Sequence, residues 1–204
     1  FKWLIIRANF AKAKEILDNL KLLPVDSAIA DLGTAQYHFA SADRGFSFEG
    51  DAPLDMRLDP RLGVTASDLL MALGEKELVK LFQIADERFA KAIAKRIVSQ
   101  RIIKPIQSTS QLTSIILSVK PKLPHKIHPA TKVFLSLRMA VNLERDSLSS
   151  LLADLPSMVK KDGYIGVISF HSGEDKLVKQ AWKSWESNSI CRRYENSPLT
   201  PTEQ

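Results

Sequence analysis

Apolar and polar residues near the start of the chain follow two patterns. Residues 1–6, FKWLII, form a short apolar run that predicts a buried strand. Asn9 then predicts a helix N-cap, and apolar residues return at helical spacing until Pro24 ends the helix. Residues 25–33, VDSAIADLG, predict a second strand. Strand, helix and strand in this order are typical of a right-handed crossover in a parallel sheet.

The middle of the chain changes from an irregular stretch to helical periodicity. Residues 34–63 show no sustained period and contain five Gly or Pro residues, which predicts a long loop of functional importance. Four helices are expected after it: one capped by Thr65 or Ser67 and ending near Leu73, one over 75–84, one opened by Asp86, and one from Ser110 to about Val119. We expect these helices to form an all-helical insert.

The last third returns to alternating helices and strands. Lysine and proline crowd residues 120–129, and an apolar stripe then predicts one long helix over 130–155. A turn at Asp162 and Gly163 precedes a predicted buried strand, GYIGVISF, over 163–170, and a helix is expected over 174–185. The chain is therefore divided into a first core part at 1–62, a helical insert at 63–126, and a second core part at 127–204.

The composition is typical of a folded globular protein and excludes several other classes. The 204 residues are 45% hydrophobic and 25% charged, which is typical of a folded globular protein. The formal charge of +6 suits an anionic partner such as RNA without requiring one. A single cysteine, Cys191, excludes an internal disulfide and fits a reducing, cytoplasmic setting. The sequence has no apolar run that predicts a membrane span and no secretory signal, and Phe1 in place of Met predicts a fragment boundary.

Two predicted strands end in residues that suit a ligand site. Asp31, followed by Leu32 and Gly33, closes one strand, and His171 closes another. Ligands of parallel α/β sheets bind at the carboxyl ends of strands, where a carboxylate can accept hydrogen bonds and glycine allows close approach. Alternatively, Asp31 caps the next turn and His171 is structural. The basic residues Lys91, Lys95, Arg96 and Arg101 either meet a phosphate backbone or form a solvated helix face.

Four longer strings resemble the ribosomal RNA small-subunit methyltransferase H family, which methylates N4 of a cytidine in 16S ribosomal RNA. They occur in the family's order: DRGFSFEGDAPLDMRLDP at 43–60, DERFAKAIAKRIV at 86–98, HPATKVFLSLRMAVN at 128–142, and ISFHSGEDKLVK at 168–179. The resemblance implies an α/β fold with a class I (Rossmann-like) methyltransferase core and a helical substrate-recognition insert. It also implies S-adenosyl-L-methionine as cofactor, small-subunit ribosomal RNA or the assembled subunit as partner, and neither a metal nor a membrane. A homodimer is left open.

The resemblance suggests cofactor contacts, and the chemistry of the side chains suggests the catalytic and RNA-binding residues. The cofactor contacts would be Phe10, Asp31, Gly33 and His38, where His38 stands in place of the family's glutamine. Asp31 would accept hydrogen bonds from the reacting amine as the catalytic residue. RNA contacts would come from Arg44, Arg57, Arg138, Asn142 and His171. As alternatives, Arg44 pairs with Asp55, and Phe46 and Phe48 only hold the loop to the core.

Departures from the family pattern leave two rival hypotheses. The family's Gly-x-Gly-Gly-His loop and the acidic residue after its second strand would precede Phe1, residues 34–40 read TAQYHFA, and Ala52 replaces a glycine. We therefore expect the chain alone to be inactive. The rivals are a noncatalytic RNA-binding relative without cofactor binding, and a ribosome-assembly factor that binds subunits through the helical insert.

Overall fold

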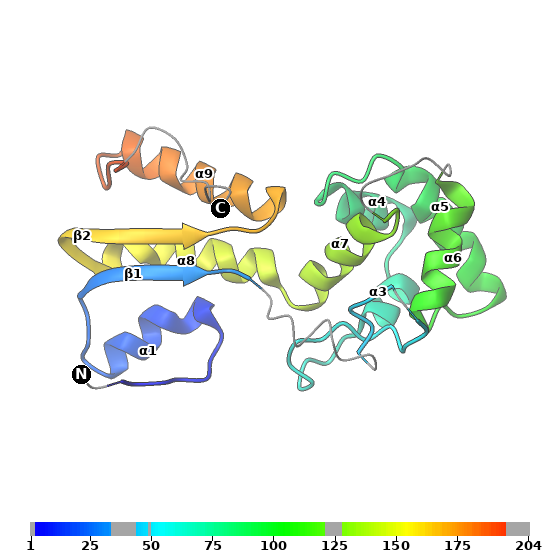
Figure 1. The fold of residues 1–204 in the computed structure, drawn as a ribbon, viewed down its shortest axis with the longest axis horizontal. Coiled ribbons are helices and arrows are strands. Elements are labelled where there is room, and N and C mark those ends of the chain that lie inside the picture. Colours follow the sequence, from blue (N-terminus) through cyan, green and yellow to red (C-terminus); the bar gives the residue numbers. More distant parts are fainter. Residues whose placement is uncertain (1–2, 34–43, 49, 121–127, 195–204) are drawn as a thin grey trace, which may run out of the picture. The chain divides into compact units, whose positions relative to one another are not determined.

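The computed structural model describes residues 3–33, 44–48, 50–120 and 128–194. The chain divides into two compact units. The sheet unit comprises residues Phe1–Gly33 and Asp146–Gln204, and the helical unit comprises Thr34–Arg145. Helices and parallel strands together make an α/β protein (Figure 1).

The sheet unit is built on two parallel strands, β1 and β2. Its elements are the 3-10 helix η1 (Phe10–Lys12), α1 (Ala13–Asn19), β1 (Val25–Asp31), α8 (Glu144–Met158) apart from its first two residues, β2 (Val159–Ile168) and α9 (Ser172–Ser187). The predicted cap is confirmed, because Asn9 Oδ1 accepts from the backbone N–H of Ala11 at 2.9 Å. The predicted strand over 25–33 is also confirmed and ends at Asp31.

The strand predicted for residues 1–6 is wrong over the part that the structure describes. Residues 3–7 have no regular structure, and the side chains of Trp3 and Ile5 are 90% and 92% exposed. A strand requires hydrogen bonds to a neighbouring strand, and among the described residues β1 pairs with β2 alone. Residues 3–6 therefore pair with neither strand, and the described part of the strand–helix–strand unit lacks its first strand.

The strand predicted for 163–170 begins earlier, at Val159, and contains the predicted turn as a bulge. Val25 pairs with Val159, but Ser27 pairs with Tyr164, so residues 160–163 bulge out of the ladder opposite Asp26. Asp162 takes a left-handed φ of 63° there. The turn signal was therefore correct in position, but it marks an irregularity within the strand rather than its beginning.

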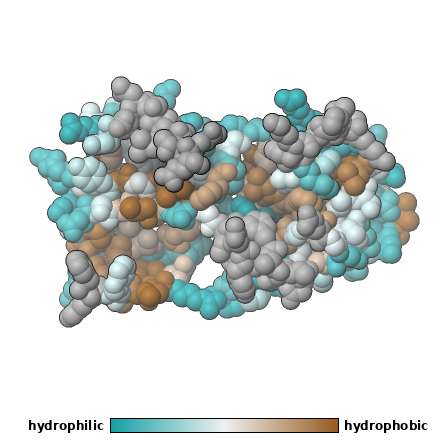
Figure 2. All heavy atoms as spheres, viewed as in Figure 1, coloured by the Kyte–Doolittle hydropathy of each residue, from teal (hydrophilic) through white to brown (hydrophobic). Residues whose placement is uncertain are grey.

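One face of this sheet packs on helices and the other is open. Leu148, Leu151, Leu152 and Leu155 of α8 and Trp185 of α9 are buried. Alternate strand residues pack against them, namely Ala28, Ala30, Ile165 and Val167. The intervening residues Ile29 and Tyr164 are 79% and 68% exposed. Figure 2 accordingly shows hydrophobic residues, in brown, at the surface of this unit.

The helical unit contains the four helices expected between residues 65 and 119, followed by a fifth. Their bounds are α3 (Ala66–Ala72), α4 (Glu75–Gln83), α5 (Ala90–Ile103), α6 (Thr109–Val119) and α7 (Thr131–Val141). Thr65 and Asp68 form a capping box at α3, as Ser108 and Gln111 do at α6. The core is one cluster to which every helix contributes, with Leu70, Leu78, Phe82, Ile93, Ile97, Leu112, Ile116 and Leu137 all 0% exposed.

Two helix boundaries differ from the predictions. Asp86 does not open α5, because its left-handed φ of 56° breaks the chain direction and α5 begins at Ala90. The carboxylate of Glu87 instead accepts the backbone N–H of Phe89 at 2.9 Å. The fourth helix is capped by Ser108 and not begun at Ser110.

The single helix predicted over 130–155 is two helices, α7 and α8. Leu143 has a left-handed φ of 50°, which an α-helix cannot accommodate. The preceding residue, Asn142, donates its side-chain amide to the carbonyl of Arg138 at 2.8 Å and to that of Met56 at 2.8 Å. Both halves keep an apolar stripe, so periodicity alone does not reveal the break.

The helical unit is wider than the insert predicted at 63–126. It takes in the loop over 44–58 and α7, which the sequence division assigned to the core parts. Phe46, Leu54 and Met56 explain the difference, because their side chains are 6%, 2% and 1% exposed within the helical core. Phe48 also packs against that core, so both phenylalanines hold the loop as the structural alternative expects.

Candidate functional site

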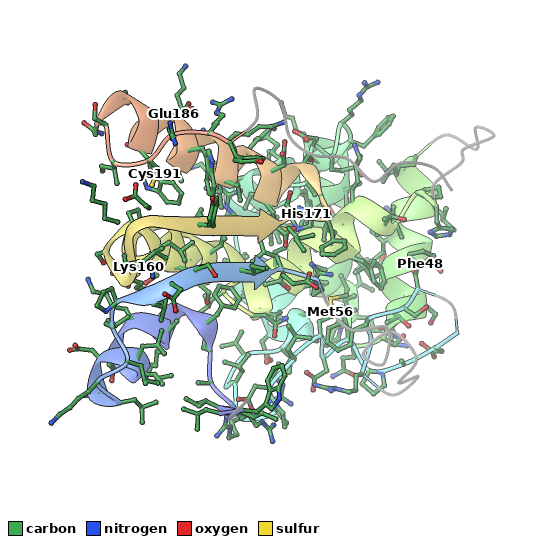
Figure 3. The ribbon with its side chains drawn as sticks, turned by 60° about the vertical axis from the view of Figure 1, so that its left-hand side comes forward. Phe48, Met56, Lys160, His171, Glu186 and Cys191 are labelled. Atoms are coloured by element: carbon green, nitrogen blue, oxygen red, sulfur yellow. The ribbon has the colours of Figure 1, made fainter. Side chains whose placement is uncertain are left out.

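The carboxyl ends of β1 and β2 bring two predicted site motifs to one edge of the sheet. Asp31, the last residue of β1, pairs in register with Ile168, the last residue of β2. His171 follows three residues later, and Figure 3 shows it where the arrow of β2 passes into α9. The side chain of Asp31 is exposed, and its Oδ1 accepts the backbone N–H of Gly33 at 3.2 Å. A carboxylate therefore stands at the strand ends with acceptor capacity left for a ligand.

Gly33 and Phe170 shape the surface beside this carboxylate. A Cβ atom at position 33 would lie 2.8 Å from Cε2 of Phe170 and 3.4 Å from Oδ1 of Asp31. A side chain at position 33 would therefore displace the aromatic ring. Phe170 is 64% exposed, so its ring is open to a planar partner. The sequence places Phe170 at this strand end beside His171, but sequence reasoning gave it no role of its own, although an aromatic after a strand can stack on a base.

His171 acts as the N-cap of α9. Its Nδ1 accepts the backbone N–H groups of Gly173 at 3.2 Å and Glu174 at 3.3 Å. Because Nδ1 accepts, the proton of the neutral ring is on Nε2, which lies 3.2 Å from Oε1 of Glu174. This geometry favours the structural alternative for His171. Its contact with RNA stays a prediction.

Glu174 was missed by the sequence reasoning and completes this turn. The residue is 7% exposed, and its Oε2 accepts the backbone N–H of Phe170 at 3.0 Å. It therefore fixes the backbone that carries Phe170 and lies beside the imidazole of His171. A cap followed by glutamate at the third position is the sequence signal that could have identified it.

A second group of predicted site residues lies in the helical unit, in the loop over 44–58. Arg57 forms a bidentate pair with Asp55, with 2.8 Å between Nε and Oδ1 and 2.7 Å between Nη2 and Oδ2. This guanidinium holds the pKa of the Asp55 carboxyl below its ordinary value. Arg57 Nη1 also donates to the carbonyl of Leu62 at 2.6 Å. Asp55 thus pairs with Arg57, while Arg44 donates to the carbonyls of Arg57 and Leu58.

Arg138 and Asn142, at the end of α7, are bonded within the protein too. Arg138 pairs with Glu144 through two bonds of 2.9 Å, and the two side chains are 11% and 17% exposed. The side chain of Asn142 accepts the backbone N–H of Leu58 at 2.6 Å in addition to its bond with Met56. Asn142 therefore ties the loop to α7. RNA contacts by these residues stay predictions.

The two remaining candidates are placed less fully. Phe10 begins η1 and is 42% exposed, so its ring is accessible in the sheet unit. His38 lies outside the described residues. The predicted site residues thus form two sets: Phe10, Asp31, Gly33 and His171 in the sheet unit, and Arg44, Arg57, Arg138 and Asn142 in the helical unit.

Parallel strands with a carboxylate and a glycine at their carboxyl ends define an α/β protein of ligand-binding type. Residues 2–203 match the MraW methylase family, and the chain belongs to that family. Membership implies the class I methyltransferase fold. In the part of the chain that the structure describes, no helix is both long and apolar enough to cross a membrane.

Curated relatives share one name, ribosomal RNA small subunit methyltransferase H. The chain is 43% identical to the protein of Syntrophotalea carbinolica over 191 residues, which are 92% of this chain and 61% of the relative. It is 51% identical to that of Gloeothece citriformis over 182 residues, 88% of this chain and 59% of the relative. The match to the Acidobacterium capsulatum protein is 37% over 205 residues, 100% of this chain and 67% of the relative. The chain spans about three fifths of the length of the first two.

Proposed function

We propose that the whole protein transfers a methyl group from S-adenosylmethionine to N4 of a cytidine in small-subunit ribosomal RNA. The observation that carries this proposal is the exposed carboxylate of Asp31 at the carboxyl end of β1, beside Gly33 and the open ring of Phe170. Family membership and the shared name of the relatives support the reaction class and the RNA substrate.

The residues at this edge suit the cofactor. Gly33 has no Cβ and Asp31 keeps acceptor capacity, so backbone and carboxylate can both approach a ligand closely. Phe10, Asp31, Gly33 and His38 are the proposed cofactor contacts. When bound, S-adenosylmethionine supplies an electrophilic methyl group on a sulfonium centre.

Asp31 would act on the nucleophile. The N4 amine of cytosine is a weak nucleophile because its lone pair is delocalised into the ring. A carboxylate that accepts a hydrogen bond from the amine localises that lone pair and stabilises the positive charge that develops as the N–C bond forms. The methyl–sulfur bond would break with its electron pair left on sulfur, so that the cofactor departs as a neutral thioether, and the amine would lose one proton to water. The base must leave its stack to reach this edge, and the exposed Phe170 ring offers it a replacement stacking partner.

The arginines of the helical unit take a supporting part in this proposal. The proposed RNA-binding side chains of this unit form hydrogen bonds within the protein: Arg44, Arg57, Arg138 and Asn142. These bonds favour a role in positioning the loop over 44–58, with RNA contact through the donors that remain.

The test uses the full-length protein, Asp31→Asn and small-subunit RNA that lacks the modification. Asparagine keeps the size of the side chain and removes its charge, so we expect cofactor-dependent methyl transfer to fall about 100-fold or more. Unchanged melting temperatures would show that the fold is intact. Transfer by Asp31→Asn at the wild-type rate would rule out the role of Asp31.

Calorimetric titration of the full-length protein with S-adenosylmethionine tests the two rival hypotheses, a noncatalytic RNA-binding relative and a ribosome-assembly factor. We expect saturable binding. No measurable binding would favour the noncatalytic RNA-binding relative. Binding to the small subunit without methyl transfer above background would favour the assembly factor.

A further inference from the structure

The positive charge of the protein is concentrated in one segment. Residues 88–143 contain eleven Lys or Arg and no Asp or Glu, whereas the rest of the chain has more acidic than basic residues. The segment runs through α5, α6 and α7 of the helical unit. Such a one-sided distribution is an electrostatic footprint for a polyanion.

Several of these cations form hydrogen bonds or ion pairs within the helical unit. Arg101 donates to the carbonyls of Leu70 and Leu73, and Lys120 pairs with Glu87. By contrast, Arg96 of α5 and Lys104, the C-cap residue that follows this helix, are exposed, and neither has an ion-pair partner among the residues that the structure describes. Their charges are therefore available to a ligand.

Arg96 and Lys104 line a surface hollow between α5 and α6 with a volume of about 290 Å³. Its polar lining is completed by Gln100 of α5 and by Gln111, Ser114 and Ser118 of α6, and no acidic side chain lines it. Gln111 is oriented, because its Oε1 accepts the backbone N–H of Gln107 at 2.8 Å. Its amide N–H groups therefore remain as donors. The hollow is at the small end of ligand pockets, which suits a phosphate better than an extruded nucleotide.

We infer that this hollow binds the sugar-phosphate backbone of the RNA substrate. The inference rests on the proposed function for the identity of the RNA. Arg96 and Gln100 lie four residues apart on α5, and Lys104 follows four residues later as the C-cap, where the backbone is extended, so the Cα atoms of the two cations are about 12 Å apart. Successive phosphates of one strand can each meet one of these cations. A strand that carries several phosphates therefore gains more from the pair than a single anion does, which favours a nucleic-acid strand.

The test compares two double variants of the full-length protein, each of which removes two positive charges from α5 or its C-cap. Arg96→Gln with Lys104→Gln removes both positive charges that line the hollow. Lys91→Gln with Lys95→Gln is the matched control, because both residues are exposed on α5 and neither lines the hollow. The probe is a fluorescein-labelled single-stranded fragment of small-subunit ribosomal RNA, titrated over a range of salt concentrations. Circular dichroism melting checks the folding of each variant.

We expect the hollow variant to bind the RNA about 10-fold more weakly, with a salt slope reduced by about 1.4, as for two lost contacts to a single strand. The control should change affinity less than about 3-fold. Equal losses in both double variants, or no loss in the hollow variant, would overturn the inference. So would a hollow variant that loses inorganic phosphate binding while its RNA affinity is unchanged.

Methyl transfer separates this inference from the proposed function. If both hold, the hollow variant raises KM for the RNA and leaves kcat unchanged. A wild-type protein that transfers methyl groups, with no change of KM in the hollow variant, would overturn the hollow alone. A wild-type protein that transfers none, with selective RNA loss in the hollow variant, would overturn the proposed function alone.

Discussion

The two units differ in how deeply they are packed. The helical unit surrounds side chains such as Leu78, Phe82 and Ile97 so completely that each is 0% exposed. The sheet unit buries one row of α8 leucines and Trp185, and leaves Ile29 and Tyr164 of its two strands open. Among the residues that the structure describes, both strands of its sheet are edge strands. Packing against the helical core therefore holds the loop over 44–58 in place. The sheet edge that carries Asp31 depends instead on the register of β1 and β2 and on the His171 cap of α9.

The same truncation in the two units should have unequal effects. Leu78→Ala should lower the free energy of unfolding by about 4–5 kcal/mol, because its surroundings cannot collapse into the cavity. Leu155→Ala, at 2% exposure beside an open sheet, should lower it by about 2–3 kcal/mol. Urea denaturation followed by circular dichroism measures both. Equal losses would break the comparison.

A buried ion pair offers a second test of the helical unit. Lys120 Nζ lies 2.6 Å from Oε2 of Glu87 and 2.6 Å from the carbonyl of Pro129, and Glu87 is 4% exposed. Lys120→Met leaves that carboxylate buried without its cation, which should lower stability by about 3 kcal/mol. Adding Glu87→Gln should recover part of this loss in the same denaturation experiment. A single variant as stable as the wild type would show that the pair is not part of the packed core.

The helix cap of the sheet unit should contribute less. His171→Ala removes the acceptor for two N–H groups of α9 and should lower stability by about 1 kcal/mol. Asparagine is a good N-cap, so His171→Asn should restore most of it. If His171→Asn is stable but loses methyl transfer in the full-length protein, the imidazole has a role beyond the cap. If both variants match the wild type in stability, the cap is unimportant.

The smallest expected effect is a pH dependence in the helical unit. Arg57 lowers the pKa of Asp55, so the folded state favours the ionised carboxylate. The stabilisation is complete above the carboxyl's ordinary pKa of about 4, and it is lost as pH falls through the lower folded pKa. Asp55→Asn should therefore be less stable than the wild type at pH 7, by under about 1 kcal/mol, and this difference should shrink as the pH falls below about 4. A difference that is constant across this range would contradict the assignment.

Local signals explain what could be predicted. Asn9 and Thr65 marked helix starts because capping involves neighbouring residues only. Asp31 marked the end of β1 because the glycine two residues later is a local turn signal. The apolar run over 1–6 misled because a strand depends on a partner that the run itself does not specify. The break after Asn142 was missed because the side chain bonds to Met56, which is distant in sequence.

The sequence predicted the candidate site only in part, as it did the fold. Strand ends and the family resemblance pointed to Asp31 and Gly33, but the ring of Phe170 beside them is visible only once both strands are placed. One alternative paired Asp55 with Arg44, yet the two-residue turn from Asp55 brings Arg57 to its carboxylate. Which of two arginines pairs with a carboxylate depends on the backbone conformation between them. Composition and residue spacing do not specify that conformation.

The central claim is that the whole protein methylates N4 of a cytidine in small-subunit ribosomal RNA. The most direct measurement is mass spectrometry of nucleosides from unmodified small-subunit RNA, incubated with the full-length protein and S-adenosylmethionine bearing a labelled methyl group. We expect labelled N4-methylcytidine with the wild type and at least about 100-fold less with Asp31→Asn. Label on any other nucleoside position, or no labelled nucleoside with a protein that binds both the cofactor and the RNA, would contradict the account.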